Sequence, residues 1–211
     1  MNEQNPFLLT GYISPKYFCD REKETIRVID AIKNNRNLTL FSHRRIGKTG
    51  LLHHIFYKMQ KNKEYSTFYL DIQDTSNINE FTKELAKTVI GKLDSFSERV
   101  IKNIGKVFSN LRPTISYDSF SGEPKINFKI NNVQEANTSL EQIIKYLEEQ
   151  NKHIVVAIDE FQQILNYPEK NVEALLRKLI QRTKNISFVF AGSHKHMLIS
   201  MFKDHSRPFY Q

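Results

Sequence analysis

The sequence has little cysteine, no long apolar run and no recognisable leader, and each absence excludes a class of protein. A single cysteine, Cys19, excludes an internal disulfide framework and fits a reducing compartment. The longest apolar runs, Ile154–Ile158 and Phe188–Ala191, are far too short to span a bilayer. The first residues, Met-Asn-Glu-Gln-Asn-Pro, lack the basic and then apolar pattern of a signal peptide. We therefore expect a cytoplasmic protein that does not use a membrane as its partner.

Three functional patterns are also missing from the sequence. His194 and His196 have no cysteine or carboxylate at zinc-ligand spacing, which argues against a zinc site. No Asn-Lys-x-Asp motif follows a strand, so nothing indicates recognition of guanine. No helix-turn-helix pattern occurs, so we expect any DNA-reading segment to lie beyond Gln211.

What the sequence does contain is typical of one α/β domain with a net positive charge. Its 211 residues suffice for one sizeable core, with 39% hydrophobic and 26% charged residues. The net charge of +8 suits a partner that carries phosphate. The basic residues are spread along the chain, however, so solvated helix surface explains them equally well.

Short buried strands alternate with amphipathic helices along the chain. Apolar residues from Ile26 to Ile32 predict a helix over 21–34, with Asp20 as its N-cap. The predicted strands are Leu38–Phe41, Thr67–Ile72, Ile154–Ile158 and Ile186–Ala191. A helix is predicted from the end of the loop to about Gln60. Further helices are predicted after Asp74-Thr75-Ser76, which would form a turn and provide the cap, over 96–108, 138–150 and 172–183, and near 196–202. Uniformly apolar strands separated by helices indicate an α/β fold with a parallel sheet covered on both faces.

The segment that follows the first strand predicts a phosphate-binding loop. Residues 42–49, Ser-His-Arg-Arg-Ile-Gly-Lys-Thr, fit the pattern G-x-x-x-x-G-K-[ST], except that Ser42 replaces the first glycine. Lys48 would reach the β- and γ-phosphates, and the Thr49 hydroxyl would bind Mg²⁺. The nucleotide-binding residues predicted here are Ser42, His43, Arg44, Arg45, Ile46, Gly47, Lys48, Thr49 and Gly50. For Arg44 and Arg45, solvated surface charge is the alternative interpretation.

A second motif follows the third predicted strand. Asp159 and Glu160 come directly after His153-Ile-Val-Val-Ala-Ile, which is the Walker B pattern. Asp159 would hold Mg²⁺ beside Thr49, and Glu160 would act as general base on the attacking water. Because a strand, Thr67–Ile72, lies between the two motifs in the sequence, we expect the additional-strand, AAA+-like branch of P-loop NTPases.

Two further features of the sequence each allow more than one interpretation. Ser193 follows the fourth strand, where a polar residue would meet the γ-phosphate and the water; a simple Gly-Ser turn is the alternative. Residues 111–131 contain two alternating segments, Thr114–Asp118 and Lys125–Ile130, separated by Ser121-Gly-Glu-Pro124, which predicts a β-hairpin insertion. A decoration like a local lid and an edge that pairs with a partner both remain interpretations of this hairpin.

Four segments together resemble the archaeal-type ATPases, a STAND/AAA+-like group of P-loop proteins. They are residues 18–24 (Phe-Cys-Asp-Arg-Glu-Lys-Glu), 42–49, 158–161 (Ile-Asp-Glu-Phe) and 190–193 (Phe-Ala-Gly-Ser). The resemblance extends to Arg207-Pro-Phe-Tyr210, so it covers nearly the whole chain. It implies ATP and Mg²⁺ as ligands, and it places Tyr17, Phe18 and Arg21 at the adenine.

The resemblance also sets expectations about what the chain lacks. Family members continue past the Pro-Phe-Tyr segment into a further strand, a helical lid and usually another domain, so we expect residues 1–211 to be a P-loop ATPase domain truncated before the lid. Ser42 in place of glycine and a missing lid arginine both predict slow hydrolysis by the isolated domain.

Three functions compete. The first is Mg²⁺-dependent ATP hydrolysis that drives a conformational change in a larger protein, with Glu160, Lys48 and Ser193 as catalytic residues. The second is a nucleotide-gated switch or scaffold with little turnover. The third is the ATPase module of a DNA-binding protein, in which regions beyond this chain would contact nucleic acid. A protein partner or self-association is compatible with each, and the fold alone does not decide among them.

Overall fold

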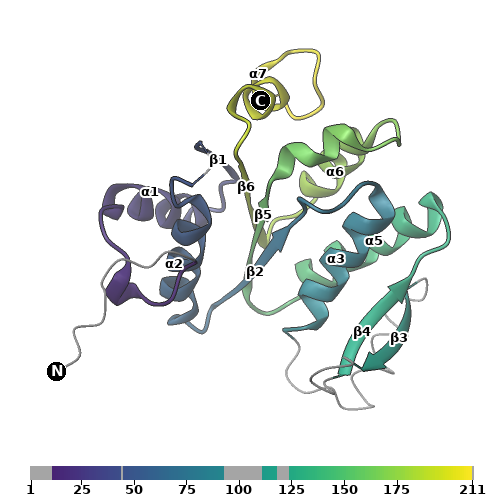
Figure 1. Cartoon of the computed structure of the whole chain (residues 1–211), viewed down its shortest axis with the longest axis horizontal. Helices are drawn as coiled ribbons and strands as arrows, with labels where there is room; N and C mark the ends of the chain where they lie inside the picture. Colours follow the sequence, from purple (N-terminus) through teal and green to yellow (C-terminus); the bar gives the residue numbers. More distant parts are fainter. Residues whose placement is uncertain (1–10, 44, 93–110, 118–123, 211) are drawn as a thin grey trace.

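The computed structural model describes residues 11–43, 45–92, 111–117 and 124–210. Its main element is a parallel sheet in the order β1-β6-β5-β2, with helices on both faces (Figure 1). The strands are β1 (Leu38–Phe41), β2 (Tyr65–Asp71), β5 (His153–Asp159) and β6 (Ile186–Gly192). The α/β fold predicted from the sequence is therefore confirmed.

Helices α1 and α2 lie on one side of the sheet, and α3, α5 and α6 lie on the other (Figure 1). Two separate hydrophobic clusters match this division. The smaller joins Val28, Leu52 and Ile55 to Val155 and Val189 of the sheet. The larger packs the helices of the opposite side, together with α7, against the other face of the same strands. The sheet thus separates two hydrophobic cores. Burial of each Leu or Ile side chain in these cores contributes about 1.5–3 kcal/mol to the stability of the fold.

The helices have the following bounds: α1 Glu22–Lys33, α2 Lys48–Gln60, α3 Ile78–Ile90, α5 Val133–Glu148, α6 Val172–Ile180 and α7 Lys195–Lys203. Short 3₁₀ helices occupy η1 (Pro15–Tyr17) and η2 (Phe161–Asn166). Spacing by four explains the burial of α3, since Phe81, Leu85 and Val89 all face the core. The predicted helix over 96–108 lies outside the described residues.

Two predicted helix caps are wrong. The N-cap of α1 is Arg21, without a side-chain cap bond, because Asp20 has φ +60° and lies before the helix. The cap of α3 is Asn77, whose side chain accepts from the Glu80 N–H, so Asp74 does not cap it. Helix α5 begins at Val133 instead of 138, because Asn132 accepts from the Glu135 N–H in the same way.

The predicted hairpin is present as a separate antiparallel sheet of β3 (Arg112–Tyr117) and β4 (Pro124–Lys129). It packs beside α3 and α5, away from the main sheet (Figure 1). Phe128 and Ile130 join the larger core. The predicted turn residues Ser121, Gly122 and Glu123 lie outside the described part of the chain.

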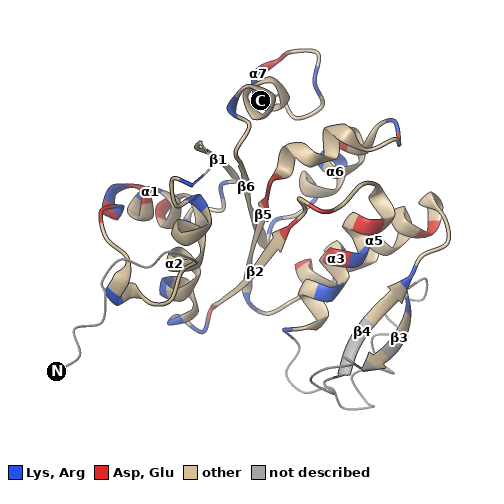
Figure 2. Cartoon of the chain, viewed as in Figure 1, with Lys and Arg blue, Asp and Glu red and all other residues tan. Residues whose placement is uncertain are grey.

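Charge is distributed over several elements. Figure 2 shows Lys and Arg on α1, α2, α3 and α6, which agrees with their spread in the sequence. Within the described ranges, no helix is both long enough and apolar enough to cross a membrane.

Candidate functional site

The loop after β1 leads directly into the N-terminus of α2. Arg45 has φ +65° and Gly47 has φ +75°, so the backbone turns through left-handed conformations just before Lys48. At Gly47 an added Cβ would meet no atom within 4 Å, so the glycine is required by its φ and not by crowding. Gly47 makes no side-chain cap, which leaves the first N–H groups of α2 for another acceptor. A phosphate is the ligand that such a helix start favours.

Asp159 ends β5 and is the most enclosed polar group of the site, with 2% of its side chain exposed. Its Oδ2 accepts from the Thr49 hydroxyl and from the Tyr69 hydroxyl, each at 2.9 Å. Its Oδ1 lies 2.7 Å from the Lys48 ammonium and accepts from the Glu160 N–H at 2.9 Å. Four donors therefore surround this carboxylate.

Glu160 follows with φ +54°, which turns its side chain back toward the end of β6. Its Oε1 accepts from Lys48 at 3.0 Å, and its Oε2 accepts from Gln162 at 2.6 Å and from the Ser193 hydroxyl at 2.8 Å. Burial acts to raise the pKa of the Glu160 carboxyl, but the hydrogen bonds from Gln162, Ser193 and Lys48 outweigh it and lower the pKa to about 2. Glu160 is consequently ionised at neutral pH.

The structure brings Lys48, Thr49, Asp159, Glu160 and Ser193 into one connected set. Sheet order explains this, because β1, β6 and β5 are neighbours and parallel, so their carboxyl ends meet at one edge. The strand between the loop strand and the Walker B strand is β6, which delivers Ser193 between the two motifs. Their catalytic and metal-binding roles remain predictions.

The other predicted residues surround this set at different distances. Ser42 donates its N–H to Gly192 O at 3.4 Å, which ties the loop to β6. His43 and Ile46 lie in the loop, Ile46 being 47% exposed, and Gly50 lies in the first turn of α2. Arg44 lies outside the described residues.

The segment predicted to meet the adenine contacts both the loop and α2. Arg21 donates from Nη2 to the Ile46 carbonyl, so this arginine bridges to the phosphate loop. The Phe18 ring stacks on the His54 ring with centroids 4.1 Å apart, so one face of Phe18 is covered by His54. Tyr17 lies in η1, with the Lys16 ammonium 5.6 Å from its ring centroid. An adenine contact for these residues stays a prediction.

Sequence reasoning missed Tyr69, His53 and Gln162. Burial raises the pKa of the Tyr69 hydroxyl, and the Asp159 charge raises it further, so Tyr69 is a neutral donor. His53 packs on the Tyr69 ring at 4.7 Å. Gln162 is 5% exposed and holds Glu160. His53 could have been found from the motif, since it lies four residues after Thr49 on the same helix face.

The donor set fits Mg²⁺ only if the nucleotide supplies further ligands. Mg²⁺ prefers oxygen, and the Thr49 hydroxyl and the Asp159 carboxylate both supply it, because the hydroxyl lies 2.9 Å from Oδ2 and the other carboxylate oxygen, Oδ1, lies beside Lys48. No group of three or more His, Cys, Asp or Glu in the described part of the chain could hold a metal ion. We therefore expect protein, phosphate and water oxygens to share the ion.

Solved structures of archaeal proteins share this fold. A Walker-type ATPase of Pyrococcus abyssi matches with TM-score 0.57 and 20% identity, over 98% of this chain and 55% of its own. The Aeropyrum pernix ORC2 protein, solved with ADPNP and ADP, matches with TM-score 0.51 and 18% identity, over 90% and 45%. The Aeropyrum pernix ORC1 protein, solved in complex with DNA, matches with TM-score 0.50 and 16% identity, over 86% and 42%. The chain thus spans about half the length of these structures.

Family membership rests on a separate comparison. No curated protein matches the chain significantly. The model of an ATPase domain found predominantly in Archaea, in contrast, matches residues 18–208, which include the loop, the Walker B motif and Ser193. The chain therefore belongs to this family of ATPase domains.

Proposed function

We propose that this chain hydrolyses ATP in an Mg²⁺-dependent reaction and passes the change at the site to the segment that follows β6. The observation that carries the proposal is the connected set in which Lys48 contacts Asp159 at 2.7 Å and Glu160 at 3.0 Å, next to an uncapped helix N-terminus. Family membership supports ATP as the substrate. A bound Mg²⁺ would neutralise charge that develops on the phosphate oxygens.

Each residue of the site would have a role in the reaction that follows from its position. The N–H groups of the loop and the Lys48 ammonium bind phosphate oxygens. When Lys48 turns to the phosphates, Glu160 loses one of the donors that hold its pKa near 2, and its carboxylate becomes more basic. Glu160 then orients the water and accepts its proton, while Ser193 and Gln162 keep hold of Oε2.

A packed path from Glu160 supports the conformational half of the proposal. Phe161, the next residue, is fully buried against Phe190 and Phe209, with ring centroids 4.5 and 5.5 Å apart. Phe202 of α7 packs against the same rings. A shift of Glu160 would therefore displace α7 and the segment that contains Phe209.

Phosphate release by Glu160→Gln tests the catalytic assignment. We expect turnover to fall by about 10²–10⁴-fold, since the amide cannot accept the proton, while ATP binding persists. Glu84→Gln is the matched control, because within the described ranges Glu84 forms an ion pair with Lys87 on α3, where both side chains are about 40% exposed. Undiminished turnover in Glu160→Gln would show that another group activates the water.

A nucleotide-gated switch with little turnover is the second candidate. The observation that favours it is that Lys48 is held by both carboxylates, so ATP must compete for this ammonium. Tight ATP binding by the wild-type chain without phosphate release would select this alternative. A DNA-binding role through further regions, a protein partner and a cytoplasmic location stay proposals, supported by the charge of +8 and the cysteine content.

A further inference from the structure

Every hydrogen-bond acceptor position of the Asp159 carboxylate is occupied. An ionised carboxylate offers about four acceptor sites, two on each oxygen. Thr49 and Tyr69 donate to Oδ2, while Lys48 and the Glu160 N–H occupy Oδ1. Because Lys48 is the donor that phosphates would draw away, Oδ1 is the oxygen that becomes available.

We propose that Tyr69 is a positioning residue that fixes Oδ2 of Asp159 and thereby presents Oδ1 to the divalent cation that accompanies ATP. This inference rests on the proposed function and adds a residue outside both nucleotide motifs. Tyr69 comes from β2, on the side of β5 opposite β6, so it reaches Asp159 from the side away from Ser193.

The placement of Tyr69 is determined by parallel pairing and by packing. Tyr69 aligns with Ala157, two residues before Asp159 on the neighbouring strand. Tyr69 packs against the core cluster that contains Ala157, and its hydroxyl reaches Asp159 two residues further along β5. His53 packs on the ring at 4.7 Å, from one turn beyond Thr49 on α2. The same helix face therefore supplies the Thr49 contact to Oδ2 and the support for Tyr69.

Conversion to Tyr69→Phe isolates the hydroxyl, because the ring, its burial and its contact with His53 remain. We expect the Mg²⁺ concentration that half-saturates binding of a fluorescent ATP analogue to rise about 10-fold, the lower end of the range for groups that orient metal ligands. The loss of Mg²⁺ affinity should exceed any loss of turnover at saturating Mg²⁺. Binding of a fluorescent ADP analogue in EDTA should not change, since Lys48 and the loop are untouched.

Tyr65→Phe is the matched control. Tyr65 lies four residues earlier on the same strand, and its ring packs on His153, far along β5 from Asp159. The urea midpoint of each variant shows whether it is folded. If Tyr69→Phe does not fold, the Mg²⁺ dependence of two other variants is compared. Tyr69→His keeps a ring and a hydrogen-bond donor at this position. His53→Ala removes only the imidazole ring that packs on Tyr69.

The outcomes separate this inference from the proposed function. If the wild-type chain requires Mg²⁺ to bind the ATP analogue and folded Tyr69→Phe requires the same Mg²⁺ concentration, the proposed role of Tyr69 is wrong. The proposed function is then unaffected. Equal losses in EDTA and in Mg²⁺ would assign Tyr69 a merely structural role. If the wild-type chain binds ATP with no Mg²⁺ dependence, the proposed function and this inference both fail.

Discussion

Three residues of the site, Arg45, Gly47 and Glu160, have left-handed backbone conformations with positive φ. Only Gly47 is a glycine, the residue that adopts such a conformation easily. For a non-glycine residue the left-handed region costs on the order of 1 kcal/mol, which contacts elsewhere must offset. Ser193, Gln162 and Lys48 provide such contacts to Glu160. The strain is located at the proposed catalytic base, where backbone strain is common.

Gly192→Ala should disturb Glu160 without touching it. A Cβ at Gly192 would lie 2.0 Å from Oε1 of Gln162 and 2.7 Å from Cδ1 of Leu198, so the Gln162 amide, whose Nε2 donates to Glu160, must shift. We expect a loss of about 1–3 kcal/mol in the free energy of unfolding and a fall in turnover. Urea denaturation and phosphate release measure both effects.

Gly50→Ala is the control for this substitution, because a Cβ there meets no atom within 4 Å. Within a helix that change should stabilise the fold by about 0.5–1 kcal/mol. The explanation is wrong if both alanine variants have the same stability.

The sequence predicted the motif residues but not the groups that hold them. Lys48, Thr49, Asp159 and Glu160 follow from local spacing, which the sequence displays directly. Tyr69 does not, because its contact with Asp159 depends on the register between β2 and β5, two segments about 90 residues apart. Gln162 lies in a 3₁₀ turn that has no apolar period to reveal it.

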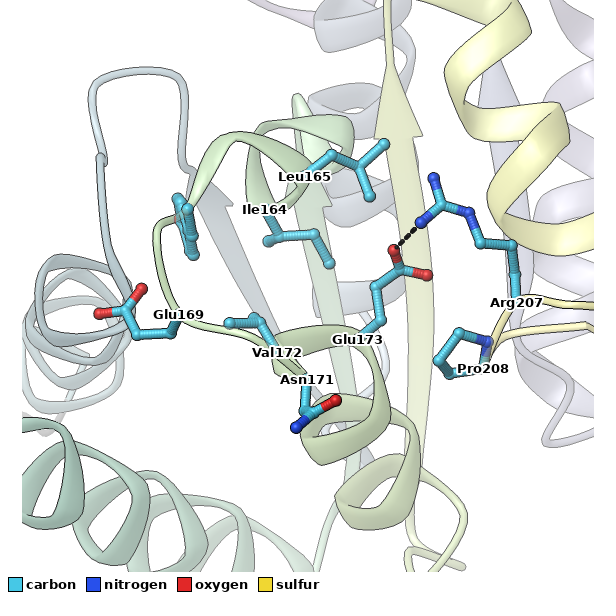
Figure 3. Close-up of a pocket in the computed structure, with 9 residues that line it drawn as sticks. Ile164, Leu165, Glu169, Asn171, Val172, Glu173, Arg207 and Pro208 are labelled. Carbon is cyan, nitrogen blue, oxygen red and sulfur yellow. Dashed lines mark hydrogen bonds and ion pairs between the residues drawn. The ribbon is translucent and has the colours of Figure 1, made fainter.

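At the level of elements, a partly buried ion pair connects α6 to the segment after α7. Figure 3 shows Arg207 pointing toward Glu173 beside a pocket of about 260 Å³ that Leu165 and Pro208 also line. Arg207 Nη1 donates to Glu173 Oε1 at 2.7 Å. The other oxygen of Glu173 is buried without a hydrogen-bond partner among the described residues. Burial raises the pKa of the Glu173 carboxyl, and Arg207 opposes this.

Arg207→Met should therefore cost more stability than Glu173→Gln. The first change leaves a buried carboxylate without its partner, and we expect a loss of about 2–3 kcal/mol, reduced by the partial exposure of Arg207. The second keeps an acceptor for Arg207 and removes the buried charge, so the loss should be under about 1 kcal/mol. Urea denaturation at pH 7 provides the comparison.

Arg36→Met serves as the exposed reference, since both members of the Arg36–Asp30 pair are about 60% exposed. Its effect should be below about 0.5 kcal/mol. Equal losses for Arg207→Met and Glu173→Gln would contradict the buried-charge explanation.

The elements themselves were largely predictable, apart from their ends and their order in space. All four main strands were found, with β1 having the predicted bounds and the others extending one or two residues further or ending one earlier. The cap of α3 and the start of α5 were misplaced, although Asn77 and Asn132 each stand three residues before a glutamate, a local capping signal. The position of β6 beside β1 is non-local and required the structure.

At the scale of the whole molecule, buried tyrosines connect stability to alkaline pH. Burial raises the pKa of Tyr167 to about 12, although a hydrogen bond with Thr75 acts in the opposite direction. A raised pKa means that the neutral phenol is favoured in the folded state. Its contribution to stability is fully present below the unfolded pKa of about 10 and is lost as the pH rises toward 12.

We expect the free energy of unfolding to fall between pH 9 and pH 12, and the fall to be smaller in Tyr167→Phe. Urea denaturation at several pH values measures it, and absorption at 295 nm follows the phenolates. Tyr210→Phe is the control, because Tyr210 is 36% exposed. A pH dependence identical in both variants would rule out Tyr167 as its source.

The central position of β5 and β6 has a consequence for how the site can open. Both strands are hydrogen-bonded on each side and buried nearly throughout, whereas β1 is a short edge strand with a partly exposed face. Amide groups of β5 and β6 should thus exchange with solvent only through global opening. We expect local fraying to begin at β1, because it is the shorter and more exposed of the two edge strands, so a bound nucleotide would lose its contacts with the lysine and threonine before the two carboxylates move.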